Sequence, residues 1–228
     1  MPKQKNRPPY RHIIFDLDGT LTDSAAGVIG SVCYALQKMG LEADTTELKT
    51  FIGPPLQRSF RERYGFNEEQ VWQAIGYFRE YYREKGIYEN RLYPGAAEML
   101  HSLAGAGKRI YLATSKATPY AETILKHFAI DRYFSFLAGA TLDGARVEKK
   151  DVLAHLLEEN RGLEPANTVM VGDHRDDIIG ARKFGLASIA VTYGYGSEEE
   201  LGRERPDRFA RSIPELTDLL LAPDHLKL

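Results

Sequence analysis

The sequence of 228 residues contains one cysteine, Cys33, which excludes an intrachain disulfide and fits a reducing compartment. It contains no apolar run long enough to span a bilayer. Residues 1–9 are polar and rich in proline, without the apolar stretch of a signal peptide, so we expect a frayed tail there. The net charge of −2 gives no electrostatic reason to expect nucleic acid or a membrane as a partner. We expect a cytoplasmic globular protein, either a monomer or a homodimer.

Short apolar runs and helical patterns alternate along most of the chain. Runs typical of strands lie at residues 12–15, 109–113, 133–138, 168–171, 187–191 and 208–209. Helical patterns lie at residues 96–104, 118–128, 150–159, 176–184 and 213–221. This order predicts an α/β fold with a doubly wound, mostly parallel, Rossmann-like sheet that helices cover on both faces.

Residues 23–92 interrupt this alternation with helical patterns alone, at 28–39, 56–64 and 68–85. In the last of these, Val71, Ile75, Phe78 and Tyr82 form one apolar face. We therefore predict an all-helical cap domain over residues 23–92, inserted into a core domain of residues 1–22 and 93–228. The cap would lie over the carboxyl edge of the sheet as a lid.

Two acids follow the first predicted strand on alternate positions. Asp16 ends the apolar run, and Asp18 is followed at once by Gly19, which permits a sharp turn. The carboxyl ends of strands are where open α/β sheets place their chemistry. Two carboxylates in one small volume repel each other unless a cation lies between them, and Mg²⁺ prefers such oxygen ligands. The alternative for such a pair is an Asx-turn in which both acids are solvated.

Residues 16–20, DLDGT, resemble the first motif of the haloacid dehalogenase superfamily of phosphotransferases. The longer stretch DLDGTLTDS resembles the phosphoglycolate-phosphatase-like branch of that superfamily. The resemblance implies that Asp16 is the nucleophile and Asp18 the general acid and base. It also implies that Mg²⁺ is bound by Asp16, by the backbone carbonyl of Asp18 and by a third acid, and that Gly19 lies at the bound phosphate.

A second polar group follows the predicted strand at residues 109–113. Thr114, Ser115 and Lys116 offer a hydroxyl and free backbone N–H groups just before a helix, which is an arrangement that binds anions. The alternative is a residue that only caps the helix. By resemblance, Thr114 binds the transferring phosphoryl group and the Ser115 backbone assists it. Many relatives have asparagine where this chain has Ser115.

The third motif of the family is a lysine before a helix, and this chain offers Lys149 and Lys150. The register of related sequences selects Lys149, whose charge would neutralise both phosphate and nucleophile. Lys150 remains the alternative, and both residues could also be solvated surface lysines.

The fourth motif comes after the buried run at 168–171, where the sequence reads VGDHRDDIIGA. By resemblance, Asp173 is the third protein ligand of Mg²⁺. Asp177 is then an outer acid that orients the waters of the metal or Lys149. Asp176 is expected to be solvated, and His174 is expected to be a loop residue.

Substrate contacts are harder to assign. Gly53, Pro54 and Arg58 lie in the predicted cap, where relatives carry a loop that contacts the substrate, and Lys116 follows the second motif. We take these four residues as candidate substrate-binding residues, with a plain helix connection as the alternative for the Gly-Pro-Pro turn. The aromatic and glycine-rich loop at residues 193–196 has no role that the sequence assigns.

Together these motifs predict a Mg²⁺-dependent phosphatase that hydrolyses small-molecule phosphate monoesters through an aspartyl phosphate on Asp16. Phosphoglycolate-like compounds and nucleoside monophosphates are both candidate substrates. Alternatives on the same scaffold are a sugar phosphomutase similar to β-phosphoglucomutase, and an inorganic pyrophosphatase. A phospho-aspartate switch is the non-enzymatic alternative, but such a switch needs no lid, and this chain devotes residues 23–92 to one.

Overall fold

A parallel sheet forms the centre of the molecule in the computed structural model, which describes residues 10–45 and 47–222. The tail predicted at residues 1–9 lies outside this range. The strand order is β5-β4-β1-β6-β7-β8, and every paired neighbour is parallel. The strands are β1 (His12–Phe15), β4 (Arg109–Ala117), β5 (Phe134–Ala140), β6 (Thr168–Gly172), β7 (Ala187–Val191) and β8 (Arg208–Ala210). The prediction of a doubly wound α/β core is confirmed.

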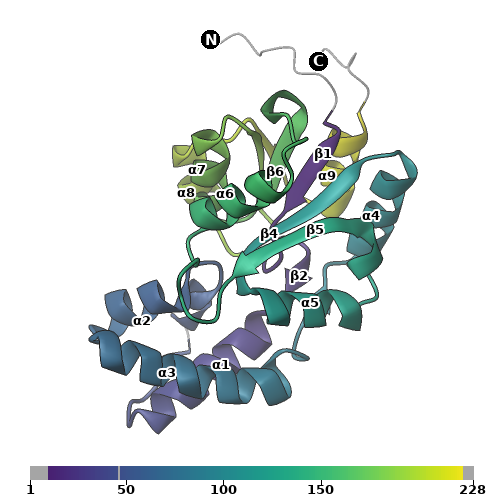
Figure 1. Cartoon of the computed structure of the whole chain (residues 1–228). Coiled ribbons are helices and arrows are strands. Elements are labelled where there is room, and N and C mark those ends of the chain that lie inside the picture. The colour runs from purple at the N-terminus through teal and green to yellow at the C-terminus, as the bar shows by residue number, and fades with distance from the viewer. Residues whose placement is uncertain (1–9, 46, 223–228) are drawn as a thin grey trace.

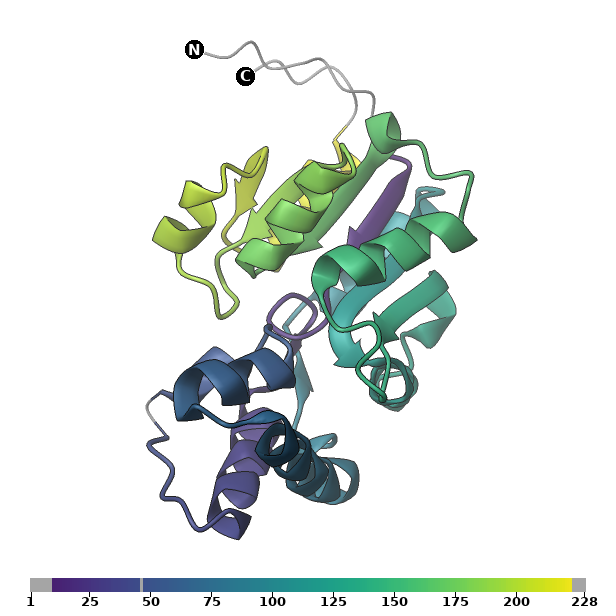
Figure 2. The same cartoon turned by 60° about the vertical axis from the view of Figure 1, so that its left-hand side comes forward.

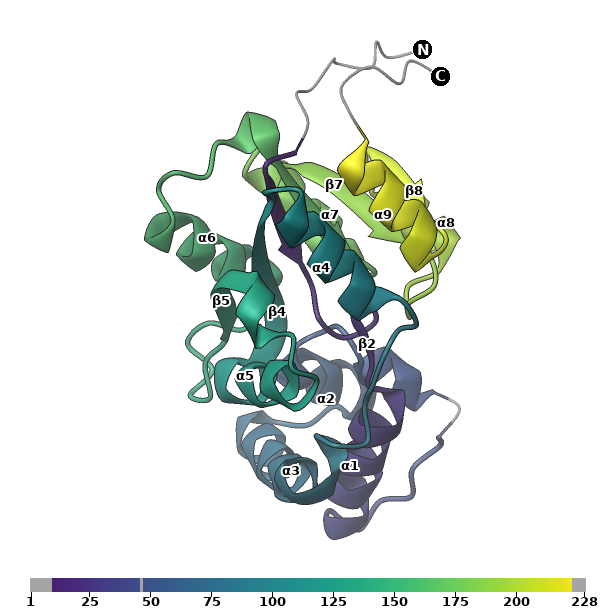
Figure 3. The same ribbon diagram turned by 90° about the vertical axis from the view of Figure 1, so that its right-hand side faces the viewer.

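Helices cover both faces of the sheet (Figure 3). One face carries α4 (Ala96–Gly105) and α9 (Ile213–Leu221), and the other carries α6 (Lys149–Glu159) and α7 (Arg175–Lys183). The helix α5 (Thr118–His127) connects β4 to β5, and a short α8 (Glu198–Arg203) precedes β8. Alternate residues of β1 divide between the two layers: Ile14 packs with the residues of α6 and α7, whereas Ile13 and Phe15 pack with those of α4 and α9.

The helical cap lies apart from the sheet, beyond its carboxyl edge (Figures 1 and 2). It consists of α1 (Ala25–Lys38), α2 (Leu56–Tyr64) and α3 (Glu68–Tyr81), with a 3₁₀ turn at Leu48–Phe51 and a π-helical turn at Tyr82–Gly86. The chain enters the cap through β2 (Thr22–Asp23) and leaves it through β3 (Arg91–Leu92), and these two strands pair antiparallel. None of the helices that the structure describes is both long and apolar enough to cross a membrane.

Three local features differ from the prediction. The helix expected over residues 68–85 ends at Tyr81 and continues as the π-helical turn. β4 extends four residues beyond the expected Ala113, to Ala117, with an irregular register against β5. The short helix α8 was not predicted, because its six residues are too few to establish an apolar period.

Candidate active site

Three neighbouring strands bring the predicted catalytic residues together. Because β1 lies between β4 and β6 and all three are parallel, their carboxyl ends meet at one edge of the sheet. Asp16 follows β1, Asp173 follows β6, and Thr114 lies in the second half of β4. All three side chains are buried. This edge faces the cap, so the polar residues lie between the two parts of the molecule (Figure 1).

Lys149 is the buried cation of this edge. It begins α6, is 2% exposed, and its Nζ lies 2.8 Å from Asp16 Oδ1 and 2.8 Å from Asp177 Oδ1. The same ammonium donates to the carbonyl of Ala113 at 2.9 Å. Burial alone would lower the pKa of Lys149, but the two carboxylates outweigh burial and raise this pKa above its ordinary value. Lys150 is exposed, so only Lys149 of the two candidates reaches the site.

Asp16, Asp173 and Asp177 form a buried acidic cluster in which one oxygen of each lies within 4.8 Å of the others. Asp173 accepts hydrogen bonds from the Thr20 hydroxyl at 3.2 Å and from the backbone N–H of Tyr195 at 2.8 Å. Burial, followed by repulsion from the other two acids, raises the pKa of Asp173 well above its usual value. A divalent cation beside Asp16 and Asp173 would relieve this repulsion, so the donor set fits Mg²⁺.

Asp177 has a different environment from the other two acids. Its Oδ1 faces Lys149, and its Oδ2 accepts a hydrogen bond from the backbone N–H of His174 at 3.1 Å. These partners fix the carboxylate against the lysine. Asp173 also has a partner at each oxygen, so what distinguishes Asp177 from it is the contact with Lys149, which suits an acid that orients this lysine.

Close backbone packing holds Asp173 in place. Gly19 has a φ of +83°, and a Cβ at this position would lie 2.0 Å from Asp173 Oδ2. A Cβ at Gly194 would lie 2.4 Å from Asp173 Cβ. Any side chain at either glycine would displace the carboxylate. The loop at residues 193–196, which the sequence left without a role, therefore closes around this acid.

Asp18 lies beside a second buried lysine. Lys116 Nζ is 3.0 Å from Asp18 Oδ2, and its side chain is 7% exposed. Asp18 Oδ1 is buried and has no hydrogen-bond partner among the residues that the structure describes. Ser115 Oγ, in the neighbouring strand β4, is also buried and has no hydrogen-bond partner among the described residues. A substrate in this region would find both an acid oxygen and a hydroxyl that are free to bind it.

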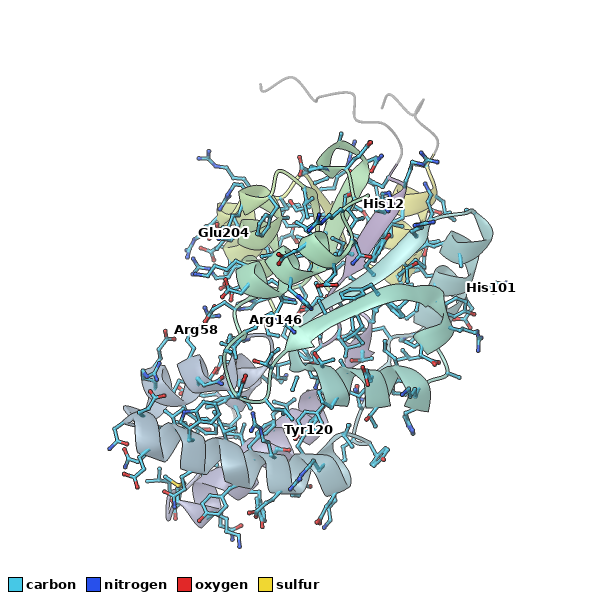
Figure 4. All side chains as sticks on the ribbon, viewed as in Figure 1. His12, Arg58, His101, Tyr120, Arg146 and Glu204 are labelled. Atoms are coloured by element: carbon cyan, nitrogen blue, oxygen red, sulfur yellow. The ribbon has the colours of Figure 1, made fainter. Side chains whose placement is uncertain are left out.

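A cavity of about 780 Å³, including open solvent at its mouth, lies between the core and the cap. The core contributes mainly polar groups, among them Asp16, Asp18, Thr114 and Lys116. The cap contributes mainly apolar groups, which are Val28, Phe51, Ile52, Leu56, Ile75, Phe78 and the ring of Tyr82. The cavity also receives Tyr120 of α5, which Figure 4 shows where the core faces the cap helices. The proposed nucleophile thus lies on the polar wall of a cavity whose opposite wall is mainly apolar.

Comparisons with known proteins agree with this geometry. The family model described as "Haloacid dehalogenase-like hydrolase" matches residues 13–191. The chain belongs to this family. The 5'-nucleotidase of Pseudomonas aeruginosa is 43% identical over 92% of this chain and 96% of its own length. The family match and the similarity to named phosphatases together show that the chain is a haloacid dehalogenase-like phosphatase.

One solved structure and one further sequence are also similar to this haloacid dehalogenase-like hydrolase. The crystal structure of a predicted phosphatase from Clostridium acetobutylicum superposes with a TM-score of 0.90, at 42% identity, and covers 93% of this chain and 99% of its own. The tyrosine-protein kinase PtkA of Mycobacterium tuberculosis is 41% identical over 91% of this chain and 72% of its own length.

The four candidate substrate residues of this hydrolase separate into two groups. Gly53, Pro54 and Lys116 line the cavity. Arg58 is not among the lining residues; its guanidinium instead pairs with Glu148 at 3.3 Å and with Asp176. The prediction of a solvated Asp176 is wrong, because this acid belongs to an ion pair between cap and core. The charge on Arg58 holds α2 against the beginnings of α6 and α7 (Figure 4).

Sequence reasoning missed three residues of the site. Arg79 and Tyr82 on the cap both line the cavity, although only the apolar spacing of Tyr82 had been noticed. Tyr195 donates its backbone N–H to Asp173 and its hydroxyl to Asp23 at 2.9 Å, which joins the acidic cluster to the strand where the cap begins. No signal in a single sequence could have placed these side chains, because their roles depend on how the cap sits on the core.

Proposed function

We propose that this protein is a Mg²⁺-dependent phosphatase that hydrolyses phosphate monoesters through an aspartyl phosphate on Asp16, with nucleoside monophosphates as its main substrates. The observation that carries the proposal is the convergence of Asp173 and Lys149 on Asp16, which lines the cavity between core and cap. A carboxylate nucleophile, a buried cation and a metal-binding acid pair are the groups that phosphoryl transfer requires.

Mg²⁺ would be held by the carboxylates of Asp16 and Asp173 and by the backbone carbonyl of Asp18. When bound there, it would neutralise charge on the phosphate and on the attacking carboxylate. Burial and the neighbouring acids raise the pKa of Asp173 and so disfavour its charged form, and a cation at this place would stabilise that charge.

The groups of the chain itself account for the chemistry. An oxygen of Asp16 attacks phosphorus, the bond from phosphorus to the leaving oxygen breaks, and Asp18 donates a proton to that oxygen. Water then attacks the phosphoryl group, Asp18 accepts a proton from it, and the acyl phosphate bond breaks to release phosphate and restore Asp16. Lys149 holds the nucleophile, while Thr114 and the Ser115 backbone bind the phosphoryl oxygens.

The cap supplies the enclosure for these steps. Arg58 binds Glu148 and Asp176 on the core, and Arg79 Nη2 donates to the carbonyl of Leu142 at 2.8 Å. These contacts join the cap to the segment between β5 and α6 and to the start of α7, and they limit the access of bulk water to the acyl phosphate. Release of product requires that they open.

The lining of the cavity supports a planar, largely apolar leaving group. Tyr120 is the partly exposed aromatic residue of this lining, and a nucleobase can stack against its ring, which lies edge-on to the buried ring of Tyr82. Arg79 lies at the same wall, and no carboxylate among the described residues pairs with its guanidinium, so its free donors can reach base carbonyls. The similarity to a named 5'-nucleotidase supports the same substrate class.

A panel of monoesters tests this proposal. With Mg²⁺, we expect the highest kcat/KM for nucleoside 5'-monophosphates, lower values for phosphoglycolate and hexose phosphates, and none for pyrophosphate. Wild-type enzyme quenched during turnover should carry phosphate that hydroxylamine removes. Asp16→Asn should form no such adduct and lose activity by about four orders of magnitude or more, whereas the exposed control Asp151→Asn should retain both.

Four outcomes would contradict the proposal. Turnover by Asp16→Asn at the wild-type rate would contradict the assignment of Asp16 as the nucleophile. Full activity in excess chelator would contradict the requirement for Mg²⁺. Complete transfer of the phosphoryl group to a sugar hydroxyl instead of water would make the enzyme a mutase. Complete transfer to a protein hydroxyl would make it a kinase, the activity that the name of the relative PtkA gives for that protein.

A further inference from the structure

One contact of the cap reaches the proposed general acid through an intermediate residue. The hydroxyl of Tyr82 hydrogen-bonds to Lys116 Nζ, and the same ammonium lies 4.5 Å from the centre of the tyrosine ring. Lys116 Nζ is in turn 3.0 Å from Asp18 Oδ2. Tyr82 is 1% exposed, so the contact is shielded from solvent. The resulting chain of polar groups runs from the cap, through a core lysine, to the carboxyl of Asp18.

The backbone around Tyr82 is unusual in a way that fixes this contact. The α-helix α3 ends at Tyr81, and the next five residues form a π-helical turn in which the N–H of Ile87 donates to the carbonyl of Tyr82 at 2.8 Å. This turn packs directly on α1, since a Cβ at Gly27 would lie 1.9 Å from the carbonyl oxygen of Gly86. π-helical turns cost helix stability and frequently occur at functional sites.

Lys116 has few alternative positions. Its side chain is almost fully buried, and its ammonium has Tyr82 on one side and Asp18 on the other. If Tyr82 moved away with the cap, the lysine would lose one hydrogen bond and the aromatic face, and its environment would become wetter. Asp18 Oδ2 is held by this ammonium, while Asp18 Oδ1 has no partner and remains available to a leaving group.

We propose that Tyr82 and Lys116 are positioning residues that set the orientation of the Asp18 carboxyl only when the cap is closed on the core. Tyr82 belongs to the cap, whereas Lys116 and Asp18 belong to the core, so the full arrangement exists only in the closed molecule. Protonation of the leaving oxygen is thereby tied to closure. This proposal rests on the proposed function, because it assigns the orientation of the acid in that reaction.

The alternative is that Tyr82 only fills space in the cavity wall. The two possibilities differ in how the rate depends on the leaving group. A poorly oriented acid slows the departure of a basic leaving oxygen far more than that of an acidic one. A packing defect or weaker closure would lower the rate for all leaving groups of the same size by a similar factor.

The experiment uses substituted phenyl phosphates, from p-nitrophenyl phosphate to unsubstituted phenyl phosphate, because they differ little in size but widely in leaving-group basicity. The measured quantity is kcat/KM, which reports the steps up to departure of the phenol. For Tyr82→Phe, we expect about a tenfold loss with phenyl phosphate and less than about a threefold loss with p-nitrophenyl phosphate. For Lys116→Met, we expect kcat/KM to fall further than in Tyr82→Phe, again more with phenyl phosphate than with p-nitrophenyl phosphate.

Two controls complete the test. Tyr81→Phe removes the neighbouring hydroxyl, which hydrogen-bonds to Glu89 within the cap, and should leave the dependence on leaving group unchanged. In an Asp18→Asn background, Tyr82→Phe should no longer make kcat/KM depend more steeply on leaving-group basicity, since the acid that Tyr82 positions is absent.

An equal loss across the series in Tyr82→Phe, or no loss at all, would overturn the proposal while leaving the phosphatase function intact. Persistence of the steepening in the Asp18→Asn background would also overturn it. A wild-type enzyme that hydrolyses no member of the series would instead contradict the proposed function, and this inference with it.

Discussion

The two walls of the cavity differ in what they are made of. The wall from the core presents charges whose partners lie within about 3 Å, such as Asp18 with Lys116, and Asp16 with the buried Lys149 behind it. The wall from the cap presents aliphatic and aromatic surface with a few polar atoms, of which Arg79 and Tyr82 are the most prominent. From this difference we expect the core to carry out the chemistry and the cap to select the substrate.

The largest effect should come from the charge of the core wall. Lys149→Met leaves two buried carboxylates without their cation, so we expect kcat to fall by about three orders of magnitude or more. Lys150→Met is the matched control, since this neighbour is exposed, and it should keep wild-type kcat. Equal losses in the two variants, measured by steady-state kinetics, would contradict the assignment of Lys149.

Metal removal tests the acidic cluster of the same wall. Excess chelator should abolish turnover, and saturating Mg²⁺ should raise the melting temperature of the wild-type protein, because a ligand at about 100 times its Kd stabilises by about 2.7 kcal/mol. Asp173→Asn should lose this Mg²⁺-dependent rise, measured by thermal denaturation with and without the ion. The same rise in Asp173→Asn as in wild type would place the ion elsewhere.

On the cap wall, Arg79→Gln removes the guanidinium that faces the cavity. We expect kcat/KM for nucleoside monophosphates to fall by about tenfold, from the loss of charge-assisted hydrogen bonds to the base. The value for p-nitrophenyl phosphate, which lacks those acceptors, should change by less than about threefold. A loss of the same size on both substrates would mean that Arg79 acts through its bond to the Leu142 carbonyl, as part of closure.

The smallest effect should come from the ion pair that connects the two parts outside the cavity. Arg58 is 30% exposed in its side chain, so its pairs with Glu148 and Asp176 are partly screened. For Arg58→Gln we expect a rise in KM of about two- to fivefold with little change in kcat, as closure becomes less favourable. Arg61→Gln on the same helix, whose pair with Glu68 lies within the cap, should leave KM unchanged.

The difference between core and cap also explains how much of the fold and of the site the sequence could predict. The core strands were predictable because apolar runs such as residues 12–15 and 168–171 are followed at once by acids, and that order also located Asp16 and Asp173. Parallel strands guarantee that such acids meet at one edge. The resemblance to the family had already favoured Lys149 over Lys150, whereas the local pattern alone could not separate two lysines at the same helix start.

The cap was predictable in its helices but not in its contacts. The apolar period that includes Phe78 and Tyr82 predicted a buried face correctly, yet a period cannot say whether that face packs on a helix or lines a cavity. Arg58 was taken as a substrate residue and proved to bind acids of the core. Such errors arise because contacts between cap and core depend on how the two parts are oriented, and a local sequence pattern does not contain that information.

The antiparallel pair β2–β3 has a consequence for how such enzymes diversify. Thr22 lies opposite Leu92, and Asp23 opposite Arg91, so the point where the chain leaves the sheet and the point where it returns are direct neighbours. A polypeptide of different size or shape could be grafted at this junction without rerouting any strand, provided that its own ends lie about 5 Å apart. We therefore expect the core to accept another enclosing domain at this junction, provided that the new domain replaces the contact that Tyr82 makes with Lys116.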